Sequence, residues 1–254
     1  MRLLVLGGTG EAMALARALA GREDLEVITS LAGRAPITGL PPGTVRIGGF
    51  GGAPGLAQYL REAGIALVID ATHPYAARIS RNAAEAATAL GLPLLRLERP
   101  PWAARPGDEW IEVDSPALAA MVARDFQRVF LTVGASDLAA FAGLPETCFL
   151  VRMIALPETP LPLASHEIIL ARGPFAEVDE LSLLRSHAIE AVVSKNSGGA
   201  ATYGKIAAAR TLGLPVIMVT RPVPTATQRR VPTVATVEDA VRWVGGMRAA
   251  LSGR

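Results

Sequence analysis

The glycines near the start of the chain stand where a phosphate group can be bound. The segment Gly7-Gly-Thr-Gly-Glu-Ala12 follows an apolar run of strand length and precedes an Ala/Leu-rich stretch of helical period. A strand, a tight glycine turn and a helix start together expose backbone N–H groups and the positive end of the helix dipole. The strict G-x-G-x-x-G spacing is absent, with Ala12 or Met13 near the third position, so an ordinary strand-to-helix turn is the alternative.

The end of the next predicted strand carries hydroxyl and guanidinium groups instead of a carboxylate. A dinucleotide-binding fold that reads a ribose 2′-hydroxyl usually places Asp or Glu there. Here the chain has Thr29, Ser30 and Arg34. Such groups suit a 2′-phosphate, and a charge-assisted contact of roughly 1.5–3 kcal/mol favours NADPH over NADH by about ten- to a hundredfold. A solvated loop arginine is the alternative for Arg34.

Two more segments of the first half follow predicted strands. Gly48-Gly-Phe-Gly-Gly52 lets the backbone approach a flat or charged group such as the nucleotide, although a flexible loop explains it equally well. Asp70-Ala-Thr-His-Pro-Tyr-Ala-Ala77 brings His73 and Tyr75 to the carboxyl edge of the sheet, where ligands bind. A histidine there can donate a proton or simply cap a helix. Arg78 and Arg81, one helical turn apart, meet ligand carboxylates or water.

The second half has its own cluster of polar residues. Phe130-Leu-Thr-Val-Gly-Ala-Ser136 repeats the strand, glycine and helix pattern, and Arg172 follows another apolar strand. The segment from Val192 to Lys205 is a strand that stops in a polar loop and enters a helix, and it contains both lysines of the chain, Lys195 and Lys205. Lysine, asparagine, serine and free helix N–H groups together form an anion-binding nest.

Apolar runs alternate with stretches of helical period along the whole chain, which predicts an α/β fold with parallel sheets. Proline and glycine interrupt this alternation at Glu98–Asp108. We therefore expect two Rossmann-like, doubly wound domains, at 1–100 and 101–254, with the ligand cleft between them. The predicted strands are 2–6, 25–29, 44–47, 66–70, 93–97, 110–113, 128–133, 148–152, 167–171, 190–194 and 215–219. The predicted helices are 10–21, 53–63, 76–90, 116–124, 136–142, 177–186, 200–212 and 237–249.

Composition limits the classes of protein that fit. The 254 residues are half hydrophobic with a net charge of +2, which excludes a disordered or fibrous chain and does not indicate nucleic-acid binding. No apolar run approaches the roughly 18 residues of a membrane span, and the chain opens without a signal-peptide pattern. We therefore expect a cytoplasmic protein with no membrane partner. Cys148 is the single cysteine, so we expect neither a disulfide nor a metal centre.

Several strings together resemble the precorrin-6A reductase family of cobalamin biosynthesis, in the same order along the whole chain. They are Gly7–Ala12, Asp70–Ala77, Ala171-Arg-Gly-Pro-Phe175, Ser194-Lys-Asn-Ser-Gly-Gly199 and Leu212-Gly-Leu-Pro-Val216. The glycine motif is generic, whereas His-Pro-Tyr-Ala and Ser-Lys-Asn-Ser-Gly-Gly are specific. The resemblance implies an oxidoreductase acting on a CH–CH group, which uses NADPH to reduce one carbon–carbon double bond of precorrin-6A to give precorrin-6B (precorrin-6Y). It is also compatible with a monomer.

The resemblance assigns each candidate residue a role. The dinucleotide is held by Gly7, Gly8, Thr9, Glu11 and Ala12, the 2′-phosphate by Ser30 and Arg34, and the nicotinamide side is bordered by Gly49, Gly51, His73, Pro74 and Tyr75. The carboxylates of the tetrapyrrole substrate are bound by Arg78, Arg172, Lys195, Asn196, Ser197 and Lys205. The group that protonates the neighbouring ring carbon stays open among His73, Tyr75, Lys195, Tyr203 and water.

Other functions fit parts of the sequence. A short-chain dehydrogenase or epimerase has Tyr and Lys four residues apart on one helical face, whereas Tyr203 and Lys205 are two apart. A non-catalytic NADPH-binding sensor fits the first hundred residues, but it does not need the Lys/Asn/Ser nest of the second half. A reductase of the same family that acts on cobalt-precorrin-6A fits as well as the metal-free one.

We expect Arg34→Ala to weaken NADPH binding much more than NADH binding, because only NADPH carries the 2′-phosphate that pairs with the guanidinium. Titration of both nucleotides against the purified variant measures this. Equal losses for the two nucleotides would remove Arg34 from the 2′-phosphate site.

Overall fold

The computed structural model describes residues 1–33 and 39–252 and has two compact α/β units. Unit 1 comprises Met1–Arg99 and Pro222–Arg254, and unit 2 comprises Pro100–Arg221. Each unit contains one six-stranded sheet, and every strand pair in both sheets is parallel. The expected fold class is therefore confirmed.

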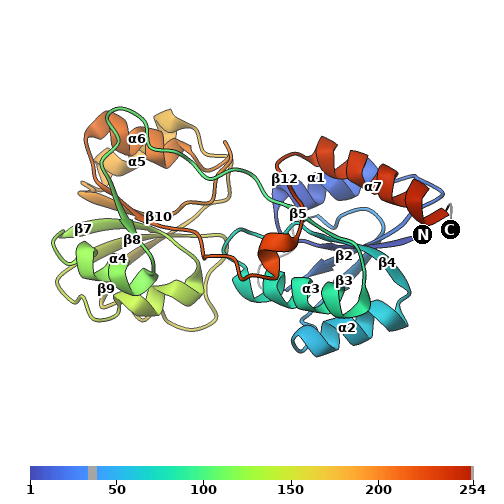
Figure 1. Cartoon of the computed structure of the whole chain (residues 1–254). Coiled ribbons are helices and arrows are strands. Elements are labelled where there is room, and N and C mark those ends of the chain that lie inside the picture. Colours follow the sequence, from blue (N-terminus) through green and yellow to red (C-terminus); the bar gives the residue numbers. More distant parts are fainter. Residues whose placement is uncertain (34–38, 253–254) are drawn as a thin grey trace. The chain divides into compact units, whose positions relative to one another are not determined.

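The sheet of unit 1 has the strand order β12-β5-β4-β1-β2-β3, which is the order of doubly wound dinucleotide-binding domains (Figure 1). Its strands are β1 (Arg2–Leu6), β2 (Glu26–Leu31), β3 (Thr44–Ile47), β4 (Ile65–Asp70), β5 (Leu94–Leu97) and β12 (Thr233–Val234). Its helices are α1 (Gly10–Leu19), α2 (Ala53–Glu62), α3 (Ala77–Leu90), the short 3₁₀ helix η2 (Gln228–Arg230) and α7 (Val237–Ser252).

The central strands of unit 1 are apolar on both faces because helices cover both faces. Leu3 and Val5 of β1 pack in one cluster with α1 and α7, while Leu4 and Leu6 pack in a second cluster with α2 and α3. This burial explains why β1 is a continuous apolar run and not an alternating one.

The expected extent of the second domain, 101–254, is wrong at its C-terminal end, because residues 222–254 belong to unit 1. β12 pairs with β5 through Thr233↔Arg96 and Val234↔Leu97, so it completes the sheet at that edge. Ala240 and Val244 of α7 are fully buried against the same cluster as α1. The returning segment thus covers apolar surface that residues 1–99 would leave exposed to water.

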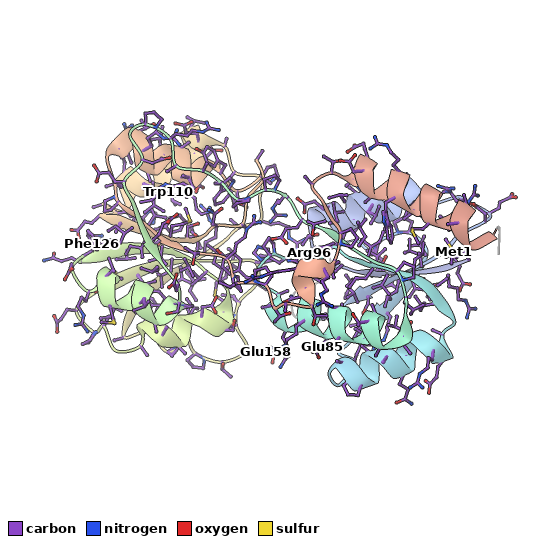
Figure 2. The ribbon with its side chains drawn as sticks, in the orientation of Figure 1. Met1, Glu85, Arg96, Trp110, Phe126 and Glu158 are labelled. Atoms are coloured by element: carbon purple, nitrogen blue, oxygen red, sulfur yellow. The ribbon has the colours of Figure 1, made fainter. Side chains whose placement is uncertain are left out.

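The sheet of unit 2 has the order β6-β11-β10-β7-β8-β9. Its strands are β6 (Trp110–Val113), β7 (Arg128–Thr132), β8 (Cys148–Met153), β9 (Ser165–Leu170), β10 (Ala191–Lys195) and β11 (Val216–Val219). Its helices are α4 (Pro116–Ala123), the 3₁₀ helix η1 (Ala135–Phe141), α5 (Glu177–Ser186) and α6 (Gly204–Leu212). The helix expected at 136–142 is therefore a 3₁₀ helix, and the one expected to begin at 200 begins at Gly204. Side chains fill the layers between each sheet and its helices (Figure 2).

Strand order reverses once in each sheet. In unit 1 the chain proceeds outward from β1 to β2 and β3, and in the opposite direction from β4 to β5. In unit 2 the same reversal separates β7 from β10. Loops that leave the carboxyl ends of these paired strands diverge, which is where ligands bind in such sheets. The loop residues picked out from the sequence follow these four strands: Gly7, His73, Gly134 and Asn196.

Among the described residues, no helix has both the length and the hydropathy needed to cross a bilayer.

The assignment of α7 to unit 1 predicts a local effect of Val244→Ala. Val244 is fully buried, so removing two of its carbons should destabilise unit 1 by about 1–3 kcal/mol. Hydrogen exchange measured by mass spectrometry should then accelerate in α1 and β1. Val223→Ala, at a valine of the same unit that is 79% exposed, is the matched control and should change little. Faster exchange in unit 2 but not in α1 would contradict the assignment.

Candidate functional site

The glycine turn of unit 1 presents exposed backbone at the start of α1. Gly8 is exposed with φ +108°, a conformation that favours glycine. Gly7 is packed instead: an added Cβ would lie 3.1 Å from Cγ2 of Thr29. The Thr9 hydroxyl accepts a hydrogen bond from the Ala12 N–H at 3.1 Å and donates one to the Ala71 carbonyl at 2.8 Å. Thr9 therefore caps α1 and ties the glycine turn to the loop after β4.

The loop after β4 carries His73 at the same edge. Nδ1 of His73 accepts a hydrogen bond from the Tyr75 N–H at 3.3 Å, and the two rings lie 5.6 Å apart. When Nδ1 accepts, a neutral imidazole carries its proton on Nε2. His73 is half-buried, whereas Pro74 is buried and Tyr75 is half-buried. The fold thus brings together the glycine turn and the His-Pro-Tyr string, which the sequence placed in one site.

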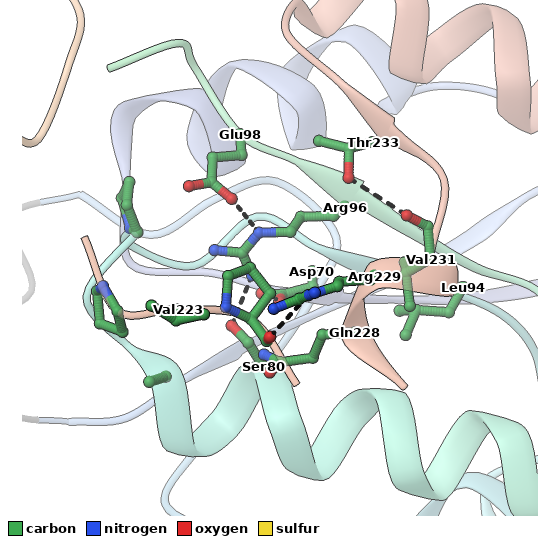
Figure 3. Close-up of a pocket in the computed structure, with 14 residues that line it drawn as sticks. Asp70, Ser80, Leu94, Arg96, Glu98, Val223, Gln228, Arg229, Val231 and Thr233 are labelled. Atoms are coloured by element: carbon green, nitrogen blue, oxygen red, sulfur yellow. Dashed lines mark hydrogen bonds and ion pairs between the residues drawn. The ribbon is translucent and has the colours of Figure 1, made fainter. Parts of the chain in front are cut away.

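A buried ion network supports this loop from the neighbouring strand. Nη1 of Arg96 on β5 donates to Asp70 Oδ2 at 2.6 Å and to Ser80 Oγ at 2.7 Å, and its Nε pairs with Glu98. Burial alone would lower the pKa of Arg96, but the charges of Asp70 and Glu98 outweigh burial and the pKa is raised. Asp70 also accepts from the Thr72 hydroxyl at 2.6 Å. Asp70, Ser80, Arg96 and Glu98 line a pocket of unit 1 together with Pro74 and several residues between 222 and 233 (Figure 3).

Glu11 in the first turn of α1 has an arginine partner. Nη1 of Arg99 donates to Glu11 Oε2 at 2.6 Å. A carboxylate at a helix N-terminus would repel a phosphate, so its pairing with a guanidinium makes the region less negative. The expectation that Glu11 touches the dinucleotide stays a prediction; its observed contact is with Arg99.

The carboxyl ends of β2 and β3 hold Ser30 next to Arg46. Ser30 is buried, and its hydroxyl accepts a hydrogen bond from Arg46 Nη1 at 3.3 Å. The same guanidinium donates to the carbonyls of Gly48 and Gly49. Arg34 lies outside the described residues. Gly49 and Gly51 are exposed in the loop that Arg46 holds.

In unit 2 the loop after β10 is fixed by contacts with the segment near Trp102. Asn196 is buried, and its amide accepts from the Trp102 N–H at 2.7 Å and donates to the Trp102 carbonyl at 2.9 Å. Arg221 Nε donates to the Asn196 carbonyl at 2.9 Å. At Gly198 an added Cβ would lie 2.1 Å from the Pro100 carbonyl oxygen, so only glycine fits. Asn196 thus serves the loop's own structure.

The remaining candidates of unit 2 differ in access. Lys195 forms an ion pair with Asp137 of η1, where both side chains are mostly covered. Ser197 is half-buried and Arg172 is exposed. The Arg172 loop lies beside the entry to α6, since the Phe175 N–H donates to the Ala201 carbonyl at 2.9 Å. In unit 1, Arg78 is exposed in the first turn of α3.

Lys205 and Tyr203 lie among other side chains. Lys205 is 4% exposed; its Nζ donates to the Thr202 carbonyl at 2.8 Å and lies 5.1 Å from the centre of the Trp102 ring. Burial lowers the pKa of Lys205 to about 7, with Glu180 raising it and Arg152 lowering it further. The Tyr203 hydroxyl accepts from Arg210, which also binds Asp108. These contacts make Lys205 and Tyr203 part of the packing at the start of α6, where the loop after β10 ends.

The side chains that hold these groups in place are not among the residues picked out from the sequence: Arg46, Arg96, Arg99, Trp102, Asp137 and Arg221. Each lies far along the chain from the group it contacts or on another strand, so no local motif includes it. Arg96 and Arg46 had one signal, a charged residue inside a short predicted strand. Such a charge needs a partner or water at the strand end.

The fold and these loops define a two-unit α/β protein whose first unit has the strand order and helix-start turn of dinucleotide-binding domains. The family model described as precorrin-6x reductase CbiJ/CobK matches residues 2–245. The chain belongs to this family.

Named relatives match nearly the whole chain. "Precorrin-6A reductase" of Rhodococcus erythropolis is 50% identical over 246 residues, covering 96% of this chain and 97% of the relative. "Cobalt-precorrin-6A reductase" of Salmonella typhimurium is 34% identical and covers 89% of each chain. The solved structure titled "CobK precorrin-6A reductase" superposes with a TM-score of 0.89 at 44% identity, covering 97% of this chain and 96% of that one.

The buried lysine predicts a specific dependence of stability on pH. In the unfolded chain Lys205 keeps its proton up to its ordinary pKa of 10.5, whereas in the folded protein it loses the proton near 7. The unfolded state therefore binds more protons between these values, and this group makes folding more favourable as pH rises from about 7 to about 10. Lys205→Met should remove this gain and be more stable than the wild type near neutral pH.

Urea unfolding of both proteins at several pH values measures the effect. The stability difference between Lys205→Met and the wild type should shrink as pH rises. Parallel pH profiles for the two proteins would show that Lys205 keeps an ordinary pKa in the fold.

Proposed function

We propose that this chain is a cytoplasmic enzyme that uses NADPH to reduce one carbon–carbon double bond of the precorrin-6A macrocycle, giving precorrin-6B (precorrin-6Y) in cobalamin biosynthesis. The observation that carries the proposal is the match, over almost the full length of both chains, to a relative named precorrin-6A reductase at 50% identity. The loops at the carboxyl edges of both sheets support it with chemistry suited to anions.

The glycine turn of unit 1 fits a dinucleotide. Its exposed Gly8 and Gly10 and the N-terminus of α1 offer backbone N–H groups to the pyrophosphate. Gly7 allows the close approach of strand and helix, and Thr9 fixes the turn against the loop of His73. Ala12 is buried beneath the turn and supports it. Bound there, the nicotinamide cofactor supplies the hydride.

His73 is the proton donor that we favour among the four candidate residues. Its Nδ1 accepts a hydrogen bond from the Tyr75 N–H, which places the imidazole at the carboxyl edge of the sheet, in the loop that Thr9 ties to the glycine turn. In this proposal Tyr75 orients His73 and borders the nicotinamide.

Unit 2 supplies groups for the acetate and propionate side chains of the tetrapyrrole. Arg172 follows β9, Lys195 is the last residue of β10 and Ser197 follows β10; these three bind carboxylates by charge and hydrogen bonding. Arg78 in unit 1 has the same chemistry. We assign Asn196, Tyr203 and Lys205 to positioning of the loop, because their polar atoms bind Trp102, Arg210 and the Thr202 carbonyl.

The metal-free macrocycle is the substrate that we favour over the cobalt-loaded one. Relatives named precorrin-6A reductase are 46–50% identical to this chain, whereas those named cobalt-precorrin-6A reductase are 32–34% identical. The cobalt-dependent reaction of the anaerobic pathway remains the second candidate.

Anaerobic mixing tests the activity directly. The purified protein is combined with precorrin-6A and either NADPH or NADH, and the absorbance of the nucleotide and of the pigment are followed together. We expect the amount of NADPH oxidised to equal the amount of precorrin-6A whose absorbance spectrum changes. Binding of NADPH without any change in precorrin-6A or in its cobalt complex would favour the non-catalytic sensor.

A substitution in unit 2 tests the division of labour between the units. We expect Lys195→Ala to raise the KM for the tetrapyrrole by about tenfold, because one charge-assisted contact is lost, while the Kd of NADPH stays within error. Steady-state kinetics and nucleotide titration of the same preparation give both values. An unchanged KM would remove Lys195 from the substrate site.

A further inference from the structure

Arg46 lies at the sheet edge where the ribose of a dinucleotide binds, and it was not among the residues suggested by the sequence. In the parallel ladder Arg46 of β3 is the register partner of Ser30 of β2. Its Nη1 donates to Ser30 Oγ at 3.3 Å and to the Gly48 carbonyl at 2.7 Å, and its Nη2 donates to the Gly49 carbonyl at 2.6 Å. Acceptors from two chain segments therefore fix the orientation of the guanidinium.

Aromatic rings hold the same guanidinium in place. The carbon Cζ of Arg46 lies 3.8 Å from the centre of the Phe50 ring and 5.1 Å from that of Tyr59. The backbone of Phe50 lies against α2, where a Cβ at Gly55 would be 1.8 Å from the Phe50 carbonyl oxygen. A side chain that is already ordered loses little entropy when a ligand binds.

In the part of the chain that the structure describes, Arg46 forms no ion pair with a carboxylate. Across the residues that the structure describes, its acceptors are a hydroxyl and two carbonyls, all of them neutral. Other arginines with limited exposure are paired with acids: Arg96 with Asp70, Arg99 with Glu11, and Arg152 with Glu180. A fixed, half-buried and uncompensated positive charge attracts an anion.

We propose that Arg46 selects a nucleotide that carries a phosphate on the 2′ oxygen of its adenine-side ribose. The inference rests on the proposed function, since it takes unit 1 as the nucleotide-binding unit. In this fold the ribose lies beyond the carboxyl end of β2, which is the position of Ser30. Among residues 1–33 and 39–252, the hydrogen bonds above engage three of the roughly five guanidinium N–H donors, and the other donors can meet phosphate oxygens.

Calorimetric titration with 2′,5′-ADP and with 5′-AMP tests the proposal without any turnover. The wild type should bind 2′,5′-ADP more tightly. Arg46→Gln should weaken 2′,5′-ADP by about ten- to a hundredfold and change 5′-AMP by less than about threefold, because only the former has the extra phosphate. Arg46→Lys, which keeps the charge and loses the fork geometry, should lie between Arg46→Gln and the wild type.

Arg61→Gln is the matched control. Arg61 is an exposed arginine at the far end of α2, so its removal changes the net charge of the unit equally without touching the Ser30 edge. Both ligands should bind it as they bind the wild type. If Arg61→Gln lowers 2′,5′-ADP affinity as much as Arg46→Gln does, general electrostatics explains the preference and the proposal is overturned.

The remaining outcomes separate this inference from the proposed function. A wild type that binds both ligands equally, or neither, contradicts the choice of NADPH itself. A wild type that prefers 2′,5′-ADP, with the preference unchanged in Arg46→Gln and Arg46→Lys, overturns the role of Arg46 and leaves the choice of NADPH intact. Equal loss of both ligands in both variants means that Arg46 only shapes the Gly48–Gly52 loop, which also overturns it. If Arg46→Gln does not fold, as judged by circular dichroism, the ratio of the affinities of Arg46→Lys for 2′,5′-ADP and for 5′-AMP decides between these outcomes.

Discussion

The hydrogen bond between the Thr9 hydroxyl and the Ala71 carbonyl is the contact around which the candidate site is built. Parallel strands place all their carboxyl ends at one edge, and the reversal of strand order between β1 and β4 sends their two loops in different directions. Thr9 joins these loops at their bases while it caps α1. The glycine turn and His73 are therefore held in a fixed relation, and the hydride transfer that we propose needs such a relation because its reacting atoms must approach to about 3–3.5 Å.

Buried charges stabilise the loops at a cost in desolvation. Arg96 contacts Asp70, Glu98 and Ser80 behind the His73 loop, and removing Arg96 would take the counter-charge from the buried Asp70 carboxylate. In unit 2, Arg152 binds Glu180 with two hydrogen bonds beneath the loops that follow β9 and β10. Such networks contribute little net stability compared with apolar packing, but they specify one arrangement of the backbone.

Sequence patterns predicted the central strands well because these strands are short apolar runs between helical stretches. They placed residues 222–254 in the wrong domain. β12 has only Thr233 and Val234, which are too few to show a period, and the apolar face of α7 could pack on any exposed sheet face. The family resemblance assigned Asn196 and Lys205 to the substrate carboxylates, and that assignment stays a prediction. Both residues contact Trp102, about a hundred residues earlier, and a linear pattern does not reveal such a contact.

Hydrogen exchange of the full chain with and without NADP⁺ tests most directly the claim that the glycine turn and the His73 loop form one nucleotide site. The account predicts that NADP⁺ slows amide exchange in residues 7–12 and 71–76 together, while residues 195–204 of unit 2 are unchanged. Protection confined to residues 195–204, or protection of the glycine turn without the His73 loop, would contradict it.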